Sequence, residues 1–162
     1  MSDSPRRPPV EPSSAGAFPD PKPRSFRFAA VLPANSEAIS PLRRELESVL
    51  HVSGLAHIAD DFALSAQEIM ANAVVHGCRH CPEGPITVTV SCDGRRIRLS
   101  VEDPSDARPH LSNALDGATS GRGMLIVDAF ADGWGVKSLS EGAGKTVWME
   151  MACTPSHRRV AA

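Results

Sequence analysis

The residues with the clearest capacity for chemistry are Glu68 and Asn72, four positions apart in the segment DDFALSAQEIMANAVVHG, residues 60–77. On a helix, side chains four positions apart share one face, so this carboxylate and this amide would lie together. A carboxylate beside an amide oxygen can act as a general base and help to hold a hydrated Mg²⁺ ion. The simpler interpretation is a polar stripe that faces water.

Helical periodicity extends this pair into a polar seam on a mostly apolar helix. Asp60 can cap the start of such a helix, and Gly77 can end it. The polar stripe comprises Asp61, Ser65, Glu68, Asn72 and His76. The opposing apolar arc comprises Phe62, Ala66, Ile69, Met70, Ala73 and Val74. We therefore expect a largely buried helix whose buried polar groups need partners.

Two other segments carry groups that a phosphorylated ligand would use. Asp103 stands where the apolar face of a predicted strand ends, and Gly121-Arg122-Gly123 opens a short apolar helix. Glycines let a ligand approach the backbone closely, and the free N–H groups of a helix start favour phosphate. Each feature alone is usually only a turn. Together with Glu68 and Asn72, they indicate a nucleotide site with a spare carboxylate.

The surrounding elements predict an α+β fold. Alternating residues predict strands at 25–32, 86–92, 96–103, 134–137 and 145–151. Asp93-Gly94 predicts a hairpin turn between the second and third strands. Helices are expected from Asn35 or Ser36 to about Leu50, over 60–77 and over 124–132, with a loop at 51–58. The expected architecture is a two-layer sandwich, with a mixed or antiparallel sheet covered on one face by about three helices.

Length and composition favour one domain with two tails. Of the 162 residues, 1–24 read as a disordered Pro-rich tail, 25–153 as the domain and 154–162 as a flexible tail. A net charge of −2 gives no basic footprint for nucleic acid, and no apolar run approaches a membrane span. The first residues do not resemble a signal peptide, so we expect a cytoplasmic protein with reduced thiols.

The order and spacing of the motifs resemble those of one family. In chain order they are Glu68-x-x-x-Asn72-Ala73-x-x-His76-Gly77, Asp103-x-Ser105-x-x-x-Pro109, Gly121-Arg122-Gly123-Met124-x-x-Val127, Trp134-Gly135 and Gly144-Lys145-Thr146-x-Trp148. Over residues 26–151 this pattern is similar to the short anti-sigma-factor-like ATPases of the histidine-kinase/gyrase/heat-shock-protein superfamily. That group includes serine kinases that hold bacterial sigma factors and phosphorylate anti-sigma-factor antagonists.

The resemblance implies a role for each residue of the helical seam and the strand end. Glu68 matches the general base that orients or deprotonates an acceptor serine hydroxyl. Asn72 matches the asparagine that holds Mg²⁺ with ATP, and His76 belongs to the same motif. Asp103 matches the aspartate that accepts a hydrogen bond from the adenine amino group.

The later motifs match the phosphate side of the same site. Gly121 and Gly123 match the phosphate-binding glycine box, in which the Arg122 guanidinium can pair with phosphate and Met124 follows. Thr146 matches a position behind the adenine. Residues 107–120 match a nucleotide lid.

The function implied by the resemblance is that of an ATP-binding regulator. It would bind a sigma factor, an anti-sigma-factor antagonist or both, phosphorylate a serine of the antagonist, and be able to form a homodimer. The wider superfamily has Asp-x-Gly-x-Gly where this chain has Asp103-Pro104-Ser105-Asp106-Ala107, without either glycine. The alternative is therefore a non-catalytic interaction module on the same fold, with weak or no ATP binding.

A third interpretation concerns the loop that follows the helix. Cys78 and Cys81 form one Cys-x-x-Cys pair, which lacks the four ligands of a structural zinc site unless His76 and His80 both contribute. A redox role for the two thiols is a further alternative, and inert loop thiols are the simplest interpretation.

Overall fold

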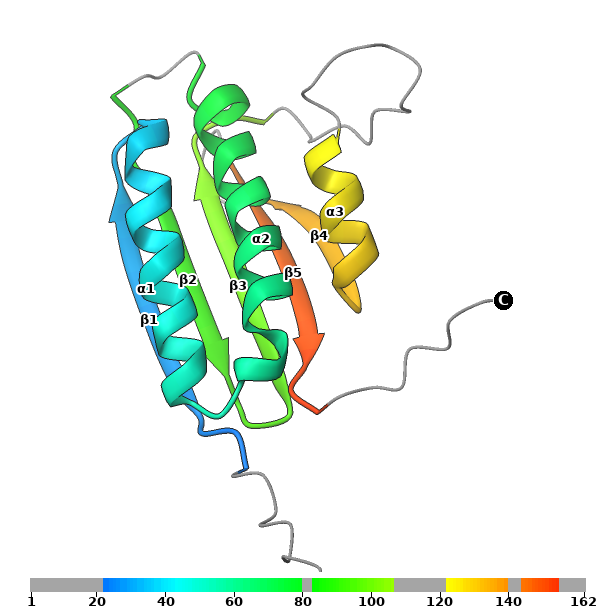
Figure 1. The fold of residues 1–162 in the computed structure, drawn as a ribbon. Coiled ribbons are helices and arrows are strands. Elements are labelled where there is room, and N and C mark those ends of the chain that lie inside the picture. Colours follow the sequence, from blue (N-terminus) through cyan, green and yellow to red (C-terminus); the bar gives the residue numbers. More distant parts are fainter. Residues whose placement is uncertain (1–21, 80–82, 107–121, 140–143, 155–162) are drawn as a thin grey trace, which may run out of the picture.

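One antiparallel sheet with helices on a single face makes up the described part of the chain (Figure 1). The computed structural model describes residues 22–79, 83–106, 122–139 and 144–154. The strands are β1 (Phe26–Leu32), β2 (Ile86–Cys92), β3 (Arg96–Asp103), β4 (Gly133–Ser138) and β5 (Lys145–Ala152). Their order across the sheet is β1-β2-β3-β5-β4, and every neighbouring pair is antiparallel. The predicted α+β sandwich is confirmed, and its sheet is antiparallel rather than mixed in these residues.

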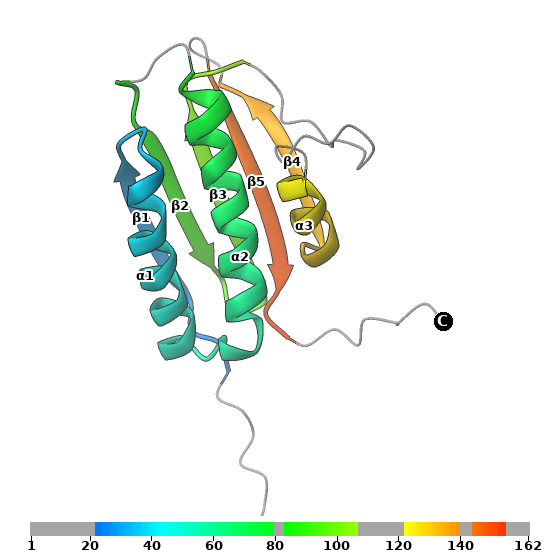
Figure 2. The same cartoon turned by 45° about the horizontal axis from the view of Figure 1, so that its top comes forward.

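In the described ranges, three α-helices lie side by side over the sheet, with α2 in the middle (Figure 2). They are α1 (Ile39–Val52), α2 (Ala56–Asn72) and α3 (Arg122–Phe130). A 3₁₀ turn, Ser36–Ala38, leads into α1, and a π-helical turn, Ala73–Gly77, extends α2. The predicted tails fall outside the described residues except at 22–24 and 154.

The hairpin of β2 and β3 shows how directly the alternating pattern becomes structure. Cys92 pairs with Ile97, and the turn between them has Gly94 at φ +87°, a conformation that suits glycine. The Asp93 carboxylate accepts hydrogen bonds of 2.8 Å from the backbone N–H groups of Arg95 and Arg96. These bonds stabilise the ionised form and hold the pKa of Asp93 below its usual value.

The helix starts were predicted with mixed success. Asn35 caps the first helical segment as predicted, because its side chain accepts a 2.8 Å hydrogen bond from the Glu37 N–H. The prediction that α2 begins at Asp60 was wrong, since the helix begins at Ala56. Fully buried Leu55 precedes it without a side-chain cap, and Gly54 at φ +80° turns the chain directly from α1 into α2. Tertiary burial of Leu55 thus replaces a cap, and the predicted loop at 51–58 shortens.

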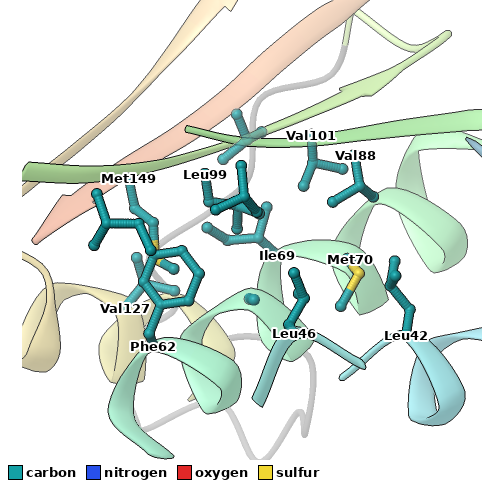
Figure 3. Close-up of a cluster of buried hydrophobic side chains, with 14 of the residues drawn as sticks. Leu42, Leu46, Phe62, Ile69, Met70, Val88, Leu99, Val101, Val127 and Met149 are labelled. Atoms are coloured by element: carbon teal, nitrogen blue, oxygen red, sulfur yellow. The ribbon is translucent and has the colours of Figure 1, made fainter. Parts of the chain in front are cut away.

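The hydrophobic core lies between the helices and the sheet (Figure 3). α2 contributes Phe62, Ile69 and Met70, each no more than 1% exposed. They pack with residues of α1, α3 and the sheet, among them Leu42, Leu46, Val88, Leu99, Val101, Val127 and Met149. The apolar arc predicted for the central helix is therefore the arc that faces the core. No helix in the described ranges combines the length and apolarity needed to cross a bilayer.

Two thiols meet beneath the end of the β2–β3 hairpin. The Sγ atoms of Cys92 and Cys153 are 3.6 Å apart, and the His57 ring nitrogen Nε2 lies 2.7 Å from the Cys153 carbonyl oxygen. Burial, with the neighbouring Cys92 thiol, raises the pKa of Cys153 to about 12. A buried thiol with so high a pKa is a poor nucleophile.

We therefore expect Cys153 to resist alkylation in the folded protein. At about pH 8, iodoacetamide should modify it at least about tenfold more slowly in buffer than in concentrated urea, because the thiolate forms only when the strand end opens. Peptide mapping by mass spectrometry measures both rates on one sample. Equal rates in the two conditions would contradict the buried position.

Candidate functional site

Glu68 lies where α2 meets the first turn of α3. A Cβ atom added to Gly123 would lie 2.5 Å from Glu68 Oε2 and 3.3 Å from Glu68 Cβ. The absence of a side chain at Gly123 therefore lets the start of α3 lie directly on this half-buried carboxylate. The structure thus brings together the predicted base and the described glycine of the predicted phosphate-binding segment.

In the π-helical turn at the end of α2, the backbone of Gly77 packs against a second carboxylate, that of Asp103. A Cβ atom added to buried Gly77 would lie 2.6 Å from Asp103 Oδ1 and 2.8 Å from Asp103 Cβ. A π-helical turn widens the helix, and such turns are frequent at functional sites. The ends of α2 and β3 and the start of α3 lie at one end of the sheet (Figure 1). Asn72 is the half-buried last residue of α2, and it lies between Glu68 and Gly77 in the sequence.

Asp103 forms a buried ion pair with Lys145, the first residue of β5. Lys145 Nζ lies 2.9 Å from Asp103 Oδ1, and the two side chains are 6% and 1% exposed. The Ser105 backbone N–H also donates to Oδ1 at 2.9 Å, while Lys145 Nζ donates to the Ser105 carbonyl at 3.2 Å. Buried Oδ2 of Asp103 has no hydrogen-bond partner among the described residues.

The chemical consequence is a carboxylate with one satisfied oxygen and one open acceptor. A buried acceptor without a donor is costly, so a ligand that brings an N–H group to Oδ2 would be stabilised there. Helix α3, of nine residues, adds the N–H groups of its first turn, which have no acceptor within the helix, near Glu68. One end of the sheet therefore offers an acceptor for a neutral N–H donor and a helix start suited to an anion.

The remaining predicted site residues lie as follows. Exposed Arg122 begins α3, whereas Met124 is 1% exposed and belongs to the core, so Met124 can meet a ligand only through its backbone. His76 is exposed in the π-helical turn. Thr146 follows buried Lys145 on β5, so strand alternation directs it to the sheet face opposite Lys145. Gly121 and the predicted lid, residues 107–120, lie outside the described residues.

Lys145 is the residue whose importance the sequence did not reveal. Lys145 is one residue of the last sequence motif, and the family resemblance assigned no role to it. Its place follows from register, because Lys145 is the direct partner of Asp103 in the β3–β5 ladder. A correct prediction that β3 pairs with β5 would have placed the two charges opposite each other.

The cysteine loop offers no metal site in the part that the structure describes. There, no group of three or more His, Cys, Asp or Glu residues is placed to hold an ion. Cys78 is 3% exposed, and its Sγ lies 3.6 Å from the Gly84 carbonyl. Cys81 and His80 fall outside the described ranges. A groove on α1 contains none of the predicted site residues and is lined by Arg44, Glu47, Ser48, His51 and Val52.

Replacing Gly77 with alanine is expected to destabilise the protein by about 1–3 kcal/mol, as overpacking does in a dense interior. The added methyl group would overlap Asp103, whose ion pair with Lys145 prevents it from moving aside. Gly133→Ala is the matched control, because its nearest neighbour would be a Trp148 ring atom at 3.9 Å, an ordinary contact. Urea unfolding of both variants measures the difference, and equal stabilities would contradict the close contact of Gly77 with Asp103.

Comparison with known proteins gives a family and a fold. The model of the histidine kinase-like ATPase domain matches residues 32–151. The crystal structure of the RsbU and RsbW domains of Rv1364c from Mycobacterium tuberculosis is similar over 77% of this chain, with 21% sequence identity and a TM-score of 0.58. This chain spans 31% of that mycobacterial chain, so the likeness concerns one part of a longer protein.

A second structure has a weaker likeness. The histidine kinase domain of the blue-light activated histidine kinase from Erythrobacter litoralis EL346 covers 74% of this chain and is itself covered over 60%, with 18% identity and a TM-score of 0.44. No curated protein matches the chain. At 21% identity the likeness to the mycobacterial structure shows the fold alone.

Proposed function

Because the chain belongs to the family of histidine kinase-like ATPase domains, we propose that it binds ATP where the end of α2 meets the start of α3 and the end of β3. The observation that carries the proposal is Asp103 Oδ2, a buried acceptor without a described partner. It stands at the position where the motif resemblance implies the acceptor for the adenine amino group. An exocyclic amine is a neutral N–H donor, which is what this oxygen needs.

The phosphate end of the nucleotide is proposed to lie at the start of α3. The first-turn N–H groups of α3 and the Arg122 guanidinium supply donors for phosphate oxygens. Asn72, the last residue of α2 and four positions after Glu68, is proposed to hold Mg²⁺ through its side-chain oxygen. Bound ATP would supply the γ-phosphoryl group for transfer. Because Gly123 has no side chain, the start of α3 lies against the Glu68 carboxylate.

The proposed activity is serine phosphorylation of the anti-sigma-factor type. In this proposal Glu68 would accept the proton of an acceptor serine hydroxyl while the serine oxygen bonds to the γ-phosphorus of ATP and ADP leaves. The start of α3 and a bound Mg²⁺ ion would neutralise the charge of the phosphates. The proposed partners are a sigma factor, an anti-sigma-factor antagonist that carries the serine, or both, and a second copy of the chain. Support comes from the motif spacing and from the fold shared with a structure that includes an RsbW domain.

One observation favours the second candidate, a partner-binding module that does not use ATP. Ser105, which stands where the wider superfamily has the first glycine of this motif, and the next residue, Asp106, are held by hydrogen bonds to Lys145 and Gly144. A turn fixed in this way adapts less to a ligand than a glycine turn. The two candidates differ in one measurable property, the affinity for Mg-ATP.

The test is calorimetric titration with Mg-ATP of the wild type, Asn72→Ala and Asp103→Asn. The proposal predicts saturable binding by the wild type and at least about tenfold weaker binding by both variants, since each loses a contact of about 1.4 kcal/mol or more. Asp61→Asn, an exposed position on the same helix, is the control and should bind as the wild type does. Absence of binding by a folded wild type would exclude the ATP proposal and favour the partner-binding module.

A further inference from the structure

The buried side chain of Lys145, the first residue of β5, links this strand to the last residue of β3, Asp103. Its ammonium group is 2.9 Å from Asp103 Oδ1 and 3.2 Å from the Ser105 carbonyl oxygen. At 6% exposure the side chain is far more buried than a lysine usually is. A buried lysine with two defined acceptors is a built feature, and the roles proposed above for Glu68 and Asn72 do not explain it.

The two carboxylate oxygens of Asp103 differ in the number of hydrogen bonds that they accept. Oδ1 accepts from Lys145 Nζ and from the Ser105 backbone N–H, each at 2.9 Å. Oδ2 is buried and has no partner among the described residues. Two donors on one oxygen fix the plane and direction of the carboxylate, so Oδ2 is the oxygen presented to a ligand.

The backbone beyond Asp103 is held by the same short segment. The Gly144 N–H donates to Asp106 Oδ1 at 2.8 Å. Gly144 has φ +141°, and a Cβ atom there would lie 2.8 Å from the Asp103 carbonyl oxygen. Residues 103–106 are therefore pinned to 144–145 at three places, without the two glycines of the wider superfamily's motif.

We propose that Lys145 is a positioning residue that fixes the Asp103 carboxylate and thereby makes the site selective for 6-amino over 6-oxo purine nucleotides. The inference rests on the proposed nucleotide site. A 6-amino purine brings an N–H donor to Oδ2, whereas a 6-oxo purine brings a second acceptor and leaves both oxygens without a hydrogen. A site that must hydrogen-bond one group rejects its mismatched analogue strongly. The wild type is therefore expected to bind ATP at least about a hundredfold more tightly than inosine triphosphate.

Asp103→Asn tests the fixed orientation. Lys145 and the Ser105 N–H both donate to the Oδ1 position, so the amide oxygen of D103N must take that position and the NH₂ group must replace Oδ2. A donor then stands where the acceptor was. D103N is expected to bind ATP more weakly than the wild type and to prefer inosine triphosphate over ATP by at least about tenfold. A variant that still prefers ATP, or binds both equally, would overturn the proposal.

Lys145→Arg tests the lysine itself. Arginine keeps the positive charge, but its planar fork bonds both oxygens of a carboxylate and so occupies Oδ2. K145R is expected to lose at least about tenfold in ATP affinity and most of the preference for ATP, as the open acceptor is closed. Lys137→Arg, on the exposed part of β4, is the control and should match the wild type.

The readouts separate this inference from the nucleotide proposal and from a merely structural role. Circular dichroism confirms folding, and calorimetry with the two triphosphates gives the affinities. A folded wild type that binds neither nucleotide overturns the proposed function, and the inference with it. A wild type that binds both equally, or a folded K145R that keeps wild-type affinity and preference, overturns the inference alone. If K145R does not fold, the preference of D103N decides, because that variant retains Lys145.

Discussion

Replacing Glu68 with glutamine is expected to lower the rate of phosphoryl transfer to an acceptor serine by at least about a hundredfold, the usual contribution of a general base. Glutamine has nearly the same shape and can keep the contact with Gly123, but it cannot accept the hydroxyl proton. Mg-ATP affinity should remain within about threefold of the wild type, since a base acts mainly in the transition state.

The measurement is transfer of labelled γ-phosphate from ATP to a candidate antagonist in the presence of Mg²⁺. Glu45→Gln, the same chemical change at an exposed position of α1, is the control and should label the antagonist as the wild type does. Undiminished labelling by Glu68→Gln would remove Glu68 as the base. A wild type that binds ATP but labels no antagonist would remove the kinase activity and leave a nucleotide-binding regulator.

Replacing Lys145 with methionine is expected to lower the free energy of unfolding by about 3–5 kcal/mol, the usual cost of breaking a buried ion pair from one side. Asp103 is 1% exposed, so the variant would leave its charge in the interior with only the Ser105 N–H as a described donor. A loss of this size is a large part of the stability of a small domain.

An exposed ion pair on the same sheet provides the matched control. Arg96 is 57% exposed and lies 3.5 Å from Glu150, so Arg96→Met should cost less than about 1 kcal/mol. The double variant Asp103→Asn with Lys145→Met carries no buried charge and should recover a substantial part of the loss. Urea unfolding of the wild type, Lys145→Met, Asp103→Asn and the double variant gives a double-mutant cycle, and Arg96→Met is measured beside it. Similar losses for Lys145→Met and Arg96→Met would contradict the buried pair.

Local periodicity was sufficient to predict most of the elements that form this site. The strict alternation from Ile86 to Cys92 and from Arg96 to Asp103 gave both strands and their faces, because a strand buried on one side has a period of two. The helical spacing of Glu68 and Asn72 placed them on α2, and the glycine pair predicted the start of α3. Each of these signals is contained in a short stretch of sequence.

The features that the sequence did not predict depend on contacts between distant segments. Lys145 meets Asp103 only because β5 inserts between β3 and β4, and no local pattern encodes that order. Gly77 was interpreted as a helix terminator, whereas the structure also needs its missing side chain for the contact with Asp103. The meeting of Cys92 with Cys153 likewise follows from the sheet order.

The proposed ATP site is tested most directly by amide chemical-shift mapping of the ¹⁵N-labelled protein during a Mg-ATP titration. The largest shifts are expected at Gly77, Ser105 and Gly123, whose backbones contact Asp103 or Glu68. Small shifts are expected along the groove on α1, which includes Ser48 and His51. Shifts confined to that groove, or no shifts at saturating Mg-ATP, would contradict the site at the junction of α2, α3 and β3.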